Sequence, residues 1–213
     1  MDHPEQYVPR TTPLMRAAGI AALAGAILWP VALAYVASGA LSDCATASGC
    51  TIDRSLLGPI GIAGLLIAIG VAGLELRATS TIGLFDLIGD LTLGTAGALL
   101  VLAAIAGSLG LLGPGLLLTL IGSVIFGAKG WDGQRRPRYG SLLIAMGAGT
   151  VIVFLLLAST VGTATVGGFE TTALGGFLLF SLGWAWLGVS LALGRPLAPA
   201  PARRPPAGQP TKR

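Results

Sequence analysis

Six long apolar stretches limit how this chain can fold more than any other feature of its sequence. A helix needs about 20 predominantly apolar residues to cross roughly 30 Å of hydrocarbon. Because the bilayer core offers no partners to backbone polar groups, each spanning stretch must be helical. The sequence therefore predicts an all-α integral membrane protein with a transmembrane domain at 17–193. Its six transmembrane helices are expected at about 17–40, 55–74, 89–108, 111–128, 139–161 and 171–193.

The composition agrees with burial in a membrane. Charged residues make up only 10% of the chain, whereas a water-facing surface needs roughly a quarter. Glycine supplies 33 of the 213 residues, about twice its usual share of about 7%. Small residues let membrane helices approach closely, so small residues four positions apart predict helix contacts. These are Ala18, Ala22 and Ala26, Ala103 and Gly107, and Ala145 and Gly149.

Proline and glycine indicate where the chain turns or bends. Residues 110–115 read Gly-Leu-Leu-Gly-Pro-Gly, which is typical of a tight turn and predicts a hairpin of the third and fourth helices. Pro59 falls in the first turns of its helix, where a missing N–H costs little. Pro30 lies in the middle of the first helix and predicts a kink there.

A short pattern, L-L-x-x-(I/L)-G, recurs in the second helix of each expected pair. It is consistent with three repeated hairpins, or with helices that converged on the same packing. The pattern occupies 65–70, 117–122 and 178–183.

The distribution of positive charge predicts the orientation. Lys and Arg resist translocation, so the side of the membrane with more of them is cytoplasmic. With the N-terminus inside, the opposite side carries only Arg54, and both termini are cytoplasmic. The cytoplasmic segments then carry Arg10, Arg16, Arg77, Lys129, Arg135, Arg136, Arg138, Arg195, Arg203, Arg204, Lys212 and Arg213.

The two ends of the chain are polar. Residues 1–16 are expected to form a cytoplasmic tail, and the first apolar run is too long for a cleaved signal peptide. Residues 194–213 are rich in Pro and Arg, so we expect a disordered cytoplasmic tail. The 11 Arg against 2 Lys, without any Asn, are typical of a GC-rich bacterial genome. The bacterial cytoplasmic (inner) membrane is the expected location.

Cys44 and Cys50 are the chain's two cysteines, and both fall in the expected first external loop. Thiols on the oxidising side of a membrane favour a disulfide. A redox-active pair and two free thiols are the alternatives, although the spacing lacks the C-x-x-C of thiol oxidoreductases.

Ionisable residues are absent from the centres of the six spans. Glu75, Arg77, Asp86 and Asp90 bracket one cytoplasmic loop, and Asp86 and Asp90 share a helix face because they are four apart. This polar cluster is interpreted as solvated interfacial charge or as a site for a cation or basic partner. The apolar residues beside it, Ile82, Phe85, Ile88 and Leu91, predict a helical turn on the membrane surface or an early start of the third span.

Tryptophan normally marks the headgroup level, but Trp29, Trp184 and Trp186 fall near the middle of their spans. These three rings could line a groove for a lipid or quinone-like molecule. The alternative is that the rings fill space between glycine-rich helices, and we favour this interpretation.

The residue inventory excludes several functions. The only histidine, His3, lies in the N-terminal tail, so the spans offer no imidazole to a metal or haem, and no cofactor is expected. No catalytic or nucleotide-binding motif is present, and nucleic acid is not an expected partner.

The leading interpretation is a non-enzymatic accessory or scaffold subunit of a larger membrane assembly. Its expected partners are the lipid bilayer, other membrane subunits or further copies of itself, and anionic headgroups that contact the basic loop and tail. The alternatives are a small transporter or binding protein for an apolar or amphipathic solute, and an enzyme that acts on lipid at the polar cluster.

Overall fold

The computed structural model describes residues 12–35, 54–77, 84–129, 138–161 and 169–194. This part of the chain is all-helical, and each of its six helices is long and apolar enough to cross a membrane. For the described residues, the prediction of an all-α fold with six helices of spanning length and apolar character is therefore confirmed. The helices are α1 (Pro13–Tyr35), α2 (Arg54–Arg77), α3 (Leu84–Ala106), α4 (Leu109–Lys129), α5 (Arg138–Val161) and α6 (Phe169–Ala192).

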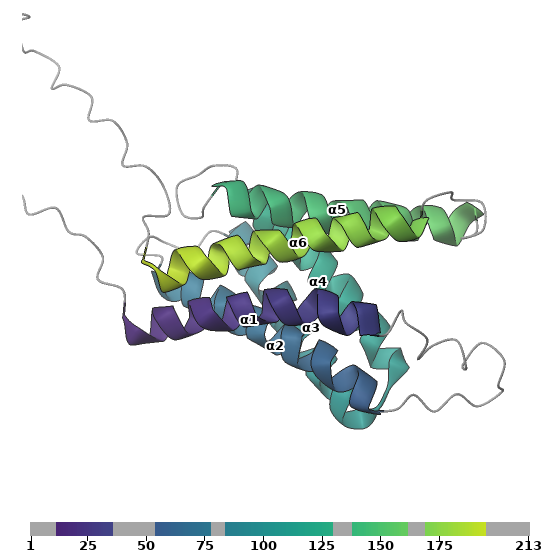
Figure 1. Ribbon diagram of the computed structural model, residues 1–213, viewed down its shortest axis with the longest axis horizontal. Helices are drawn as coiled ribbons and strands as arrows, with labels where there is room; N and C mark the ends of the chain where they lie inside the picture. The colour runs from purple at the N-terminus through teal and green to yellow at the C-terminus, as the bar shows by residue number, and fades with distance from the viewer. Residues whose placement is uncertain (1–11, 36–53, 78–83, 130–137, 162–168, 195–213) are drawn as a thin grey trace, which may run out of the picture.

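The six helices pack in a closed ring. Each helix contacts the next along the chain, and α6 returns to contact α1 (Figure 1). Neighbours run antiparallel, as α1 and α6 show, because Gly19 near the start of α1 lies against Ala192 at the end of α6. We call the end where α1, α3 and α5 begin the basic end, because it holds Arg16, Arg77, Lys129 and Arg138. Arg54 begins α2 at the opposite end.

Glycine sets the spacing of the ring. Gly140 and Gly147 on α5 face Gly183 and Gly176 on α6, and a Cβ placed on Gly183 would lie 2.8 Å from the carbonyl oxygen of Gly140. No side chain fits there, so the two backbones are in direct contact. The same contact closes the ring, because a Cβ on Gly188 of α6 would lie 2.7 Å from the Gly19 carbonyl oxygen.

The predicted small-residue contacts hold in part. Ala18 and Ala22 of α1 lie against Gly73 and Gly70 of α2, and Ala145 of α5 lies against Gly127 of α4. Gly149 was expected to do the same, but a Cβ there would meet open space. Spacing by four identifies a face of a helix but not the neighbour that covers it.

The turn between α3 and α4 lies earlier than predicted. Residues 110–115 belong to α4, and the chain reverses at Gly107 and Ser108. Gly107 has a φ of 65°, which glycine adopts without strain and which ends α3. The Ser108 carbonyl then accepts 3.3 Å hydrogen bonds from the N–H groups of Leu111 and Leu112. Two residues therefore complete the turn, and Pro114 is accommodated inside α4.

The start of α1 follows a local cap, and α1 and α3 begin earlier than predicted. The Met15 N–H donates to Thr12 Oγ1 at 3.3 Å, which caps α1 one residue before Pro13. α1 therefore begins within the predicted tail, and it continues past Pro30 to Tyr35. α3 begins at Leu84, so Ile88 and Leu91 belong to an early start of the third span.

Candidate functional site

Four aromatic side chains fill the centre of the ring. Trp29 of α1 lies 6.0 Å from Phe180 of α6, Phe180 lies 6.3 Å from Trp184, and Trp184 stacks on Phe126 of α4 at 5.1 Å between ring centroids. These spacings are those of favourable aromatic pairs. All four side chains are fully buried. We call this row, Trp29, Phe180, Trp184 and Phe126, the aromatic ladder.

The three tryptophans considered for a groove fall in two places, two in the core and one at the surface. Trp29 and Trp184 both belong to the aromatic ladder, where Phe180 separates them. Trp186 is 49% exposed, and a Cβ on Gly140 would lie 3.0 Å from its Cδ1. Because Gly140 is the third residue of α5, Trp186 lies close to the basic end, where an interfacial ring anchors a helix.

Several polar atoms are buried without a hydrogen-bond partner among the described residues. They include Nε1 of Trp29 and of Trp184, and the hydroxyl groups of Ser123, Ser141 and Ser181. The Thr119 hydroxyl, in contrast, donates to the Gly115 carbonyl at 2.8 Å. Each unpartnered donor can bind a water molecule or a polar guest, because burial without a partner costs free energy.

The predicted polar cluster lies at the basic end. Glu75 near the end of α2 and Asp90 near the start of α3 are both half-buried. Arg77 and Asp86 belong to the same helix ends, and their side chains lie outside the described part. Within the described ranges, no group of three or more potential ligands could hold a metal ion. The predicted disulfide cannot be placed, because Cys44 and Cys50 lie outside the described residues.

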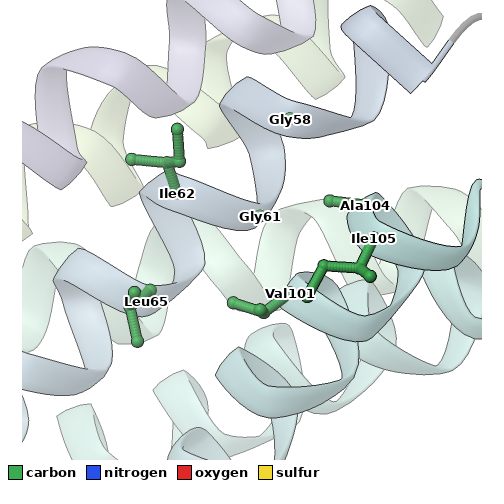
Figure 2. Close-up of a pocket in the computed structure, with 7 residues that line it drawn as sticks. All are labelled: Gly58, Gly61, Ile62, Leu65, Val101, Ala104 and Ile105. Carbon is green, nitrogen blue, oxygen red and sulfur yellow. The ribbon is translucent and has the colours of Figure 1, made fainter.

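A groove of about 250 Å³ opens on the outer surface between α2 and α3 (Figure 2). Val101 and Ala104 project from α3 toward α2, where Gly58 and Gly61 contribute no side chain. The floor is tight, because a Cβ on Gly61 would lie 2.9 Å from the Ala104 Cβ. The lining is apolar throughout and consists of Gly58, Gly61, Ile62, Leu65, Val101, Ala104 and Ile105.

Sequence reasoning missed both the groove and half of the ladder. The spacing of Phe180 and Trp184 by four places both rings on one face of α6 and was a usable signal. The sequence around Phe126 and around the groove carried no such signal. Contacts between different helices decide whether Phe126 is buried and where a groove opens.

The helices and their apolar surface define a polytopic membrane protein with a filled centre and a groove on its outer wall. No protein family, curated protein or solved structure matches this chain.

Proposed function

We propose that this protein is a non-enzymatic accessory or scaffold subunit of a larger membrane assembly. The aromatic ladder carries the proposal, because Trp29, Phe126, Phe180 and Trp184 occupy the centre, where a transporter needs space for its solute. A filled centre suits a protein that acts through its outer surface.

The proposed topology is three hairpins with both termini in the cytoplasm of a bacterial cell, and a Cys44–Cys50 disulfide in the external loop. The basic end supports this orientation, since Lys129 and Arg138 lie there while Arg54 lies opposite. The repeated pattern supports the hairpins: its glycines, Gly70, Gly122 and Gly183, face Ala22, Leu93 and Ile144, each on the preceding helix.

The outward face of α3 is where we expect a partner helix. Gly94, Thr95 and Ala98 are all exposed, and a Cβ on Gly94 would meet open space. A face of small residues lets a second helix approach closely, which large lipid-facing residues prevent.

The test is co-purification in mild detergent, followed by mass spectrometry, of the native chain and of Gly94→Leu. We expect partner subunits or further copies of the chain to co-purify with the native protein and to be lost with Gly94→Leu. Gly113→Leu is the matched control, because Gly113 on α4 also faces open space. The proposal fails if Gly94→Leu retains the native set of partners at native abundance.

A binding protein for an amphipathic solute is the second candidate. The observation that favours it is the pair of indole N–H groups, on Trp29 and Trp184, that are buried without acceptors. Replacement of either residue by Phe keeps most of the ring and removes the donor. Under this alternative a bound molecule seen by native mass spectrometry is lost from the Phe variants at unchanged melting temperature.

A further inference from the structure

The core of the ring holds polar groups from four helices, α1, α4, α5 and α6, that have no hydrogen-bond partner among the described residues. Each belongs to a side chain that is more than nine-tenths buried. Burial of a polar group without a partner costs free energy, so a set of such groups calls for a common explanation. The set consists of the indole N–H groups of Trp29 and Trp184 and the hydroxyl groups of Ser123, Ser141 and Ser181.

Contacts between the helices bring the two indoles and the α4 serine to similar depths. Trp184 stacks on Phe126 at 5.1 Å between ring centroids. Ser123 precedes Phe126 by three residues of α4, which is about 4.5 Å along the helix. Trp29 lies 6.0 Å from Phe180, and Phe180 is four residues, or about 6 Å, from Trp184 on α6.

Ser141 and Ser181 complete the set. Ser181 precedes Trp184 by three residues of α6. A Cβ on Gly183 would lie 2.8 Å from the Gly140 carbonyl oxygen. Ser141, the next residue of α5, therefore lies at the level of Gly183 and Trp184. All five groups fall within about two helical turns of depth, and we call them the polar layer.

The polar layer lies near the middle of the membrane. Trp184 is eight residues before Ala192, the last residue of α6, and Phe180 is twelve residues before it. These separations correspond to about 12 Å and about 18 Å along the helix. Half of a hydrocarbon core is about 15 Å thick. Lipid chains offer no hydrogen bonds at this depth, so the partner of these groups must lie inside the ring.

Threonines on the same helices show the local alternative. The Thr119 hydroxyl of α4 and the Thr150 hydroxyl of α5 each donate at 2.8 Å to the carbonyl oxygen four residues earlier. Ser123, one turn after Thr119, makes no such bond, and neither does Ser141. The serine hydroxyl groups are therefore available to a guest, whereas the threonine hydroxyl groups are already bonded.

The polar layer selects its guest by hydrogen bonding and by size. Indole N–H groups only donate, whereas hydroxyl groups donate and accept, so the guest must at least accept hydrogen bonds. The rings of the aromatic ladder lie 5.1 to 6.3 Å apart between centroids, which leaves no space for a further ring between them. Water meets both conditions, and it is the usual partner of buried polar groups that the protein leaves unpaired.

We propose that the polar layer binds ordered water molecules at the centre of the membrane domain. The indole N–H groups of Trp29 and Trp184 donate to this water, and the serine hydroxyl groups supply its remaining hydrogen bonds. The water joins α1, α4, α5 and α6 at a depth where lipid offers no polar contact. The site does not depend on the scaffold function proposed above.

The first test is nuclear magnetic resonance of the native chain, labelled with ¹⁵N in its tryptophans and held in perdeuterated detergent. The chain has four tryptophans, so single Trp→Phe variants assign the indole signals. We expect dipolar magnetisation transfer from water to the indole protons of Trp29 and Trp184, although both side chains are buried. The rotating-frame experiment separates this transfer from chemical exchange by its sign. Absence of the transfer at both indoles in the folded native chain would overturn the proposal.

The second test removes the hydroxyl groups. The double variant Ser141→Ala, Ser181→Ala should lower the transfer at one or both buried indoles by about half, because a buried water molecule needs two to four polar partners. Thr119→Val is the matched control, since the Thr119 hydroxyl is already bonded to the Gly115 carbonyl. This control should leave the transfer unchanged. Native transfer in the folded double variant contradicts the role of the serines.

Other occupants give different results. An added mass in native mass spectrometry, with indole contacts to that molecule in place of water, assigns the polar layer to an amphipathic solute and refutes the water site. Indole signals that shift when chloride is replaced by gluconate assign it to an anion and also refute it. If the double variant fails to fold, the native chain still decides through the first test. Gly94→Leu reports on the partner face alone, so failure of the scaffold proposal is distinguishable from failure of this one.

Discussion

Replacement of Trp184 by Ala tests whether the aromatic ladder holds the ring of helices together. Trp184 is fully buried and contacts Phe126 and Phe180 at centroid distances of 5.1 Å and 6.3 Å. Truncation of a buried Trp to Ala costs about 3 to 5 kcal/mol in soluble proteins, because contacts are lost and a cavity is left. At about 2 to 4 °C per kcal/mol for a chain of this size, the melting temperature should fall by about 10 °C.

The matched control is Trp186→Ala, two residues along the same helix. Trp186 is 49% exposed, so its removal leaves a gap that lipid or detergent fills. We expect a loss of less than about 1 kcal/mol. Thermal unfolding followed by circular dichroism at 222 nm measures both variants without relying on tryptophan emission.

A Phe variant separates packing from hydrogen bonding. Trp184→Phe keeps an aromatic ring between Phe126 and Phe180 and removes an indole N–H that is buried without an acceptor. The two effects oppose each other, because an unsatisfied donor costs about 1 to 3 kcal/mol. We expect the net change to be within about 1.5 kcal/mol of the native stability. Equal destabilisation by Trp184→Ala and Trp186→Ala would refute the reasoning, since burial would then not determine the contribution of the ring.

Three further predictions concern the glycine contacts, the disulfide and the topology. Gly147→Leu should prevent stable folding, because a Cβ there would lie 2.6 Å from the Gly176 carbonyl oxygen. Gly175 faces open space, so Gly175→Leu is the control and should remain monodisperse in size-exclusion chromatography. If the proposed Cys44–Cys50 disulfide forms, replacement of both residues by Ser should lower stability by about 2 kcal/mol, because a short closed loop is lost; thermal unfolding with and without reductant measures this. In that cysteine-free background, Ser48→Cys should react with a membrane-impermeant maleimide in intact cells. Gln134→Cys and Gly208→Cys should react only after lysis. Labelling of Gly208→Cys in intact cells would contradict a cytoplasmic C-terminus.

Hydropathy was sufficient to predict the helices, because length and apolar character alone decide whether a segment can span a membrane. The turn between α3 and α4, which was predicted from glycine and proline content, was misplaced. Residues 110–115 have the composition of a turn, but Gly107 and Ser108 need only one positive φ and one capping carbonyl to reverse the chain. A glycine and proline inside a spanning helix are tolerated where the surroundings satisfy the freed backbone groups, so the composition of a turn is ambiguous in this setting.

The candidate sites were harder to predict, because lipid and protein interior are equally apolar. In a helix on the surface of a soluble protein the exposed face is polar, so the sequence pattern shows which face is exposed. In α3, Leu100 is fully buried and Leu102 is 51% exposed, and nothing in their identity distinguishes them. The same ambiguity applies to Trp184 and Trp186, which were grouped by type and lie on different sides of α6. Only contacts between helices separate a core residue from a lipid-facing one.

Glycine positions help to show which helix faces are buried, but only when glycines in close helix contact are distinguished from glycines that face open space. Gly147 and Gly183 are required because a backbone lies where their side chain would be, whereas Gly58, Gly94 and Gly113 face open space. Glycine in a helix interior costs about 0.5 to 1 kcal/mol relative to Ala, and no close contact inside the ring offsets that cost at the open positions. At these open positions the described residues leave space beside the helix, so the glycine is not required by a neighbour inside the ring. At Gly58 that space is the apolar groove between α2 and α3.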